Sequence, residues 1–95
     1  MASAVVKWQL KKTSARLRTL REELRVIDEQ RMYLTDDADE LELRAIVADS
    51  PGARSEAREA GGHAAAIAKA RGHVVDEIAR LERRQDELLD RLSAG

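Results

Sequence analysis

The sequence predicts an all-α fold, an antiparallel coiled-coil helical hairpin, on three observations. Apolar residues recur at alternating spacings of three and four residues in both halves of the chain, which is the pattern of a coiled-coil seam. The composition is 37% charged and 2% aromatic, which is typical of long helices and not of a thick globular core. The single proline, Pro51, stands between the two halves and marks a turn.

The first half of the chain predicts a helix over about 4–48, because no Gly or Pro interrupts the pattern after residue 4. Its seam positions form two sets with seven-residue spacing: Leu10, Leu17, Leu24, Arg31, Ala38 and Ala45, and then Thr13, Leu20, Ile27, Leu34, Leu41 and Ala48. Thr35 followed by Asp36 also has the pattern of a helix start. The alternative is therefore a separate, short third helix over 36–48.

The second half predicts a helix over about 51–92. Its seam sets are Ala57, Ala64, Arg71, Ile78, Gln85 and Leu92, and Ala53, Ala60, Ile67, Val74, Leu81 and Leu88. Ser50 before Pro51 indicates an N-cap and a first helical residue, so we expect the turn at about 49–52. Two long helices joined by a short turn pack antiparallel. We expect one helical-hairpin domain over 1–95.

The pattern also predicts which residues face each other across the seam. The apolar layers are Leu17 with Leu81, Leu20 with Ile78, and Leu24 with Val74. Polar Thr13 is expected opposite Gln85, and Ile27 opposite Arg71. Gly61 and Gly62 interrupt the second helix and cost it stability relative to alanine. They indicate either a close approach of the two helices, which we favour, or a hinge.

An acidic cluster follows Thr35: Asp36, Asp37, Asp39, Glu40 and Glu42. Carboxylates can bind metal ions or act as acids and bases, but the second helix offers no acidic partner opposite. We therefore favour a solvated face near a helix start. His63 is expected near this cluster in a surface salt link, and His63 and His73 lack the spacing of a zinc pair. With no cysteine either, we expect no metal, no cofactor and no catalytic residue, hence no enzyme.

The first 21 residues are basic, with Lys7, Lys11, Lys12, Arg16, Arg18 and Arg21 and no acidic residue. Together with Trp8 they would suit nucleic acid or an anionic membrane surface. In the antiparallel arrangement Glu82, Asp86, Glu87 and Asp90 would flank Lys11, Lys12 and Arg16. We favour this charge matching between helices, and nucleic-acid binding remains the alternative function.

The strongest functional signal is apolar and lies off the seam of the first helix, at Val26, Met32, Tyr33, Leu43, Ile46 and Val47. A helix with a second apolar stripe usually has a second partner. We predict a non-enzymatic protein–protein interaction module, an adaptor or regulatory subunit, that docks on a protein or forms a homodimer. Electrostatic contacts are expected from Asp36, Asp37, Asp39, Glu40, Lys7, Lys11 and Lys12. A third helix over 36–48 would bury the stripe instead.

No apolar run approaches the roughly 18 residues that cross a membrane, and no signal peptide is recognisable, so we expect a cytoplasmic protein. The abundance of Arg over Lys, and of Ala, suggests a bacterial source. A hairpin with acidic residues resembles the coiled-coil factors that enter the secondary channel of bacterial RNA polymerase. Here Asp36, Asp37 and Asp39 lie some ten residues before the turn, with only Asp49 at it. The resemblance implies binding to transcription machinery, which we keep beside nucleic-acid binding as the alternative function.

Overall fold

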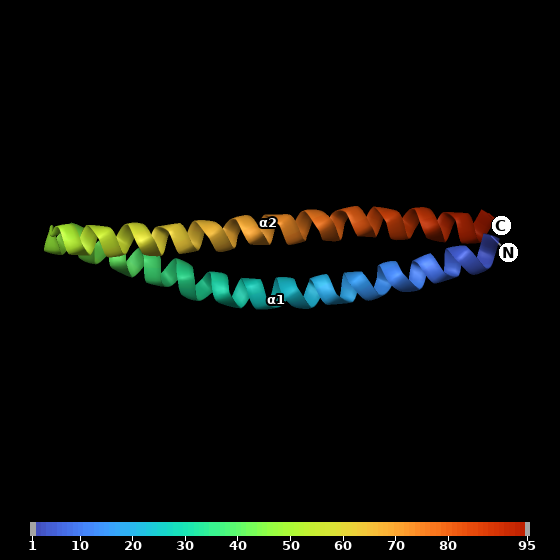
Figure 1. Ribbon diagram of the computed structural model, residues 1–95, viewed down its shortest axis with the longest axis horizontal. Helices are drawn as coiled ribbons and strands as arrows, with labels where there is room; N and C mark the ends of the chain where they lie inside the picture. The colour runs from blue at the N-terminus through green and yellow to red at the C-terminus, as the bar shows by residue number, and fades with distance from the viewer. Residues whose placement is uncertain (1, 95) are drawn as a thin grey trace. The chain divides into compact units, whose positions relative to one another are not determined.

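The structure is a computed structural model that describes the backbone of residues 2–94 and the side chains of residues 3–94. It is all-α, as the sequence predicts, and consists of two long helices packed against each other. Helix α1 spans Ala2–Ala48 and helix α2 spans Pro51–Ala94 (Figure 1). The two helices follow the predicted order, with the turn reduced to Asp49 and Ser50.

Helix α1 continues through Thr35, so the alternative of a third helix over 36–48 is wrong. Thr35, Asp36 and Asp37 are exposed. Their side chains can therefore hydrogen-bond to water and need not compete for the backbone hydrogen bonds of the helix. Beyond them Ala38 and Leu41 remain partly shielded at their seam positions. Because the seam continues on both sides of Thr35, a helix break there would lose backbone hydrogen bonds and the partial burial of Ala38 and Leu41.

The turn is built from a left-handed residue and an N-cap. Asp49 has a φ of 46° and its N–H donates to the Ala45 carbonyl over 3.0 Å, which is the αL form of a helix C-cap. The Ser50 hydroxyl accepts a hydrogen bond from the Ala53 N–H over 3.2 Å. The predicted N-cap is therefore confirmed, and it satisfies one of the free N–H groups at the start of α2.

The chain divides into two compact units, each containing part of both helices. Unit 1 comprises Met1–Leu24 and His73–Gly95, and unit 2 comprises Arg25–Gly72. In unit 1 the start of α1 lies beside the end of α2, and in unit 2 the two helices are joined by the turn (Figure 1).

Unit 1 holds the larger apolar core. Leu17, Leu20 and Ile78 are buried together, with Leu24, Val74 and Leu81 packed against them. The predicted apolar layers thus fall within one cluster, as the register requires. The polar pair differs by one residue: the Gln85 amide donates to the Ser14 hydroxyl over 3.0 Å and not to Thr13.

Unit 2 has a thinner core, because Ala60 is its one buried apolar residue within the described part of the chain. Near the predicted meeting of Ile27 with Arg71, the arginine side chain forms a polar contact with the residue that follows Ile27. Arg71 Nε donates to Asp28 Oδ1 over 2.7 Å. Alanine is small, so an alanine-rich seam removes less apolar surface from water than a leucine seam does.

The remaining seam positions follow the prediction with two exceptions. Arg31 and Ala48 are exposed, whereas all other predicted seam residues are at least partly shielded. The predicted close approach at Gly61 and Gly62 is wrong, because a Cβ atom built on either glycine would have no neighbour within 4 Å. Helix α2 nevertheless passes through both glycines without interruption.

Candidate interaction surface

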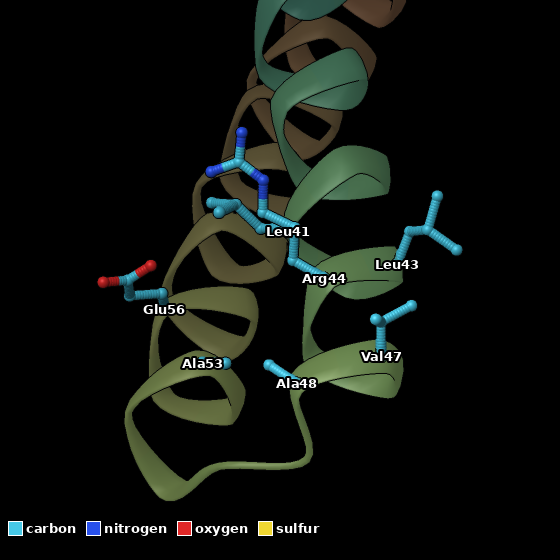
Figure 2. A pocket seen from close by; sticks show the side chains of 7 residues that line it. All are labelled: Leu41, Leu43, Arg44, Val47, Ala48, Ala53 and Glu56. Atoms are coloured by element: carbon cyan, nitrogen blue, oxygen red, sulfur yellow. The ribbon is translucent and has the colours of Figure 1, made fainter.

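The six predicted off-seam residues of α1 are all exposed, and all belong to unit 2: Val26, Met32, Tyr33, Leu43, Ile46 and Val47. Tyr33 and Val47 each keep 79% of their surface exposed, and Ile46 keeps 72%. These values are high for large apolar side chains. Leu43 and Val47 point from α1 away from α2 (Figure 2), so the intramolecular seam does not cover them.

The six residues form two patches and not one continuous stripe. We call Val26, Met32 and Tyr33 the tyrosine patch, and Leu43, Ile46 and Val47 the turn-side patch. Between them on the same helical face lie Asp36 and Asp39, because Asp36 is seven residues before Leu43 and Asp39 is seven before Ile46. Any partner that covers both patches must therefore also accommodate these carboxylates.

Each patch borders a surface pocket. At the turn, a pocket of about 430 Å³ is lined by Leu41, Leu43, Arg44, Val47, Ala48, Ala53 and Glu56 (Figure 2). A second pocket, of about 420 Å³, is lined by Glu29, Met32, Tyr33 and Asp36. The first has mostly apolar walls, with Arg44 and Glu56 as its charged residues. Such a surface can receive apolar side chains of a partner.

The acidic cluster is exposed along its whole length. Glu40 accepts a hydrogen bond from Arg44 over 2.7 Å, one helical turn away. Asp37 and His63 line a common pocket of about 240 Å³ together with Glu59, so His63 does lie near the cluster as predicted. Within residues 2–94, no group of three or more His, Asp or Glu side chains is arranged to hold a metal ion.

The basic start of α1 is arranged differently from the prediction. Lys12 Nζ lies 4.7 Å from the centroid of the Trp8 ring, which is a cation–π geometry. Arg16 pairs with Glu77 over 3.4 Å. The predicted matching of Lys11 and Lys12 with Glu82, Asp86, Glu87 and Asp90 is wrong, because neither lysine forms an ion pair with another described residue. Lys7, Lys11 and Lys12 are all exposed.

Two exposed apolar residues at the start of α1 were missed as surface residues by the sequence argument. Val5 is 57% exposed and Trp8 is 58% exposed. The signal was available in the spacing: Val5 precedes Tyr33, and Trp8 precedes Leu43, by whole multiples of seven residues. By heptad position both belong to the outer face of α1, defined here as the face opposite the seam.

None of the described helices has a stretch both long enough and apolar enough to cross a membrane. No family model, curated protein or solved structure matches this chain.

Proposed function

We propose that this chain is a non-enzymatic coiled-coil interaction module, an adaptor or regulatory subunit, that docks a protein through the outer face of α1 in unit 2. One observation supports this most strongly: the tyrosine patch and the turn-side patch remain exposed on a helix whose other face already packs against α2. The seam cannot use these side chains, so they are available to a partner.

The energetics favour docking at this place. Burying one large apolar side chain contributes about 1.5–3 kcal/mol, and Tyr33 and Ile46 are among the most exposed apolar residues of the chain. Several such burials together reach the range of about 4–15 kcal/mol that association costs in translational and rotational freedom. Tyrosine is also enriched among the residues that dominate binding energies.

The absence of catalysis is part of the same proposal. A catalytic site needs polar groups that converge on a substrate. At the turn-side pocket the two charged residues, Arg44 and Glu56, stand among apolar side chains, which is a lining better suited to an apolar side chain than to proton transfer.

Photo-cross-linking in cells tests the proposal directly. Benzoylphenylalanine is placed at Tyr33 or Ile46, and, as matched controls, at the exposed α2 positions Ala68 and Leu89. We expect covalent adducts at the first two positions and none at the controls. Equal labelling at all four positions would contradict docking through the outer face of α1.

A double variant completes the test. Tyr33→Glu with Ile46→Glu should remove the adducts while circular dichroism still reports a helical chain, because both side chains are exposed. The control variant, Ala68→Glu with Leu89→Glu, adds the same charge on α2 and should leave the adducts unchanged.

Nucleic-acid binding is a second candidate, supported by the exposed Trp8 beside Lys11 and Lys12 in unit 1. Contacts with phosphates weaken steeply as salt rises, whereas apolar docking does not. Fluorescence anisotropy with a labelled oligonucleotide at several salt concentrations separates the two. Binding that falls with salt and is lost in Lys11→Glu with Lys12→Glu would support this candidate.

A further inference from the structure

We propose that the partner is a second copy of this chain: the outer face of α1 in unit 2 of one copy packs against the outer face of α1 in unit 1 of the other, with these two helical segments antiparallel. The inference deepens the proposed function and rests on it. What it adds is the identity of the partner, its orientation and the charged residues that select it.

The two faces have complementary patterns in opposite order along the helix. In unit 1 the apolar residues Val5 and Trp8 come first, and the basic residues Lys11 and Lys12 follow one turn later. In unit 2 the acidic residues Asp36 and Asp39 lie between the tyrosine patch, which precedes them, and the turn-side patch, which follows them. Antiparallel packing brings Lys11 and Lys12 to the acidic residues and, at the same time, both Val5 and Trp8 to the turn-side patch.

A single alignment satisfies several positions together. When Lys12 is placed opposite Asp39, Trp8 falls opposite Leu43 and Val5 falls opposite Ile46. A parallel alignment on the same first pair would instead place Trp8 against Thr35 and Arg16 against Leu43. Opposite charges across an interface attract and fix its register, whereas a charge against an apolar side chain loses hydration without gaining a partner.

The charged groups needed for this pairing are available. Lys11, Lys12, Asp36 and Asp39 are exposed and form no ion pair with any residue in the described part of the chain. Trp8 is also more than half exposed, and an aromatic side chain brings a large apolar area into an interface. The basic face of unit 1 and the acidic face of unit 2 are therefore both exposed on a single chain. They can pair with those of a second copy without any rearrangement of the seam.

The acidic residues also argue against the simplest alternative dimer. If unit 2 of one copy packed against unit 2 of another through both patches, Asp36 and Asp39 would face the same residues of the second copy. Like charges placed together at an interface are strongly unfavourable. Pairing of unit 2 with the basic unit 1 removes this repulsion. If each copy contributes both faces, the pairing is reciprocal and closes a dimer.

Sedimentation equilibrium of the full chain tests the inference with charge reversals. The basic-face variant carries Lys11→Glu and Lys12→Glu, and the acidic-face variant carries Asp36→Lys and Asp39→Lys. We expect wild type to dimerise and each variant alone to dimerise at least about tenfold more weakly, because each now presents like charges. An equimolar mixture of the two variants should recover the dimer, since both of its interfaces are again complementary.

A matched control separates pairing from net charge. Lys7→Glu with Arg21→Glu changes the net charge by the same amount as the basic-face variant, at exposed positions outside the outer face. It should dimerise like wild type, and circular dichroism should show that all variants remain helical. A dimer that is unaffected by the reversals, or a mixture that does not recover, would overturn the inference.

The outcomes also distinguish this inference from the function on which it rests. A wild-type chain that stays monomeric at high concentration overturns the second copy as partner. If position 33 or 46 still forms cross-links in cells in that case, the docking surface stands with a different protein. If neither is observed, both proposals fail.

Discussion

Arg71 of α2 donates a hydrogen bond from Nε to Oδ1 of Asp28 in α1 over 2.7 Å, and so links the two helices within unit 2. This hydrogen bond is the main cause that lowers the pKa of Asp28 below its ordinary value; desolvation opposes it, and the positive charges of Arg71 and Arg31 add to the lowering. The Arg71 side chain is 39% exposed and that of Asp28 is 40% exposed. Solvent therefore screens the pair, and its contribution to stability is modest.

The Asp28–Arg71 pair predicts a specific pH dependence. Because the pKa of Asp28 is lower in the folded than in the unfolded chain, its contribution is present above the ordinary aspartate pKa of about 3.9. It is lost as the pH falls through the folded pKa. Urea denaturation should show Asp28→Asn less stable than wild type near neutral pH, with the difference shrinking in acid. Asp90→Asn, at an exposed site, is the control, and a difference independent of pH would contradict the assignment.

The seam of unit 1 should carry much of the stability. Leu20 is 1% exposed and Ile78 is 9% exposed, so truncating either to Ala should cost about 2–5 kcal/mol in chemical denaturation. Leu89→Ala, at a half-exposed site outside the seam, should cost about 0.5 kcal/mol or less. Equal losses at the three positions would mean that Leu20 and Ile78 do not form a core layer.

Gly61→Ala should stabilise the chain by about 1 kcal/mol, because alanine has the higher helix propensity. The new methyl group would meet nothing within 4 Å, so no steric cost opposes the gain. Thermal unfolding followed by circular dichroism measures the change. Ala60→Gly, at the neighbouring buried position, should shift stability the other way. A loss of stability in Gly61→Ala would show that the helices need the space in solution.

The N-cap at the turn should contribute measurably. Ser50→Ala removes the acceptor of the Ala53 N–H and should lower the free energy of unfolding by about 1 kcal/mol. Ser50→Asp keeps a side-chain acceptor and should remain close to wild type, which makes it the matched control. If both variants lost the same stability, the hydroxyl would not be acting as a cap.

The sequence predicted the seam correctly because burial along a helix follows a fixed period. Leu17, Leu20, Leu24 and their partners in α2 could be paired by counting alone, since antiparallel packing leaves few registers that match leucine with leucine. The turn could also be predicted, because it depends on local residues: Ser50 and Pro51 prefer their observed positions irrespective of the rest of the chain. The exposure of Tyr33, Ile46 and Val47 followed from the same period.

The errors arose where a local preference met the packing of the whole helix. Thr35 with Asp36 resembles a helix start, but the seam on both sides of it keeps α1 continuous. Gly61 and Gly62 resemble a close contact, but the space beside them is open. A sequence contains no direct record of the distance between two helices, because that distance depends on all the side chains between them.

The sequence by itself thus determined two helices, their antiparallel register, the turn, and which apolar residues lie off the seam. Only the tertiary structure decided that Gln85 reaches Ser14, that Arg71 reaches Asp28, and that Lys11 and Lys12 have no ion-pair partner on α2. Long polar side chains can contact any of several neighbours. Which neighbour such a side chain contacts depends on its rotamer and on the helix spacing in the folded chain. The seven-residue period of the seam, in contrast, is already present in the amino-acid sequence.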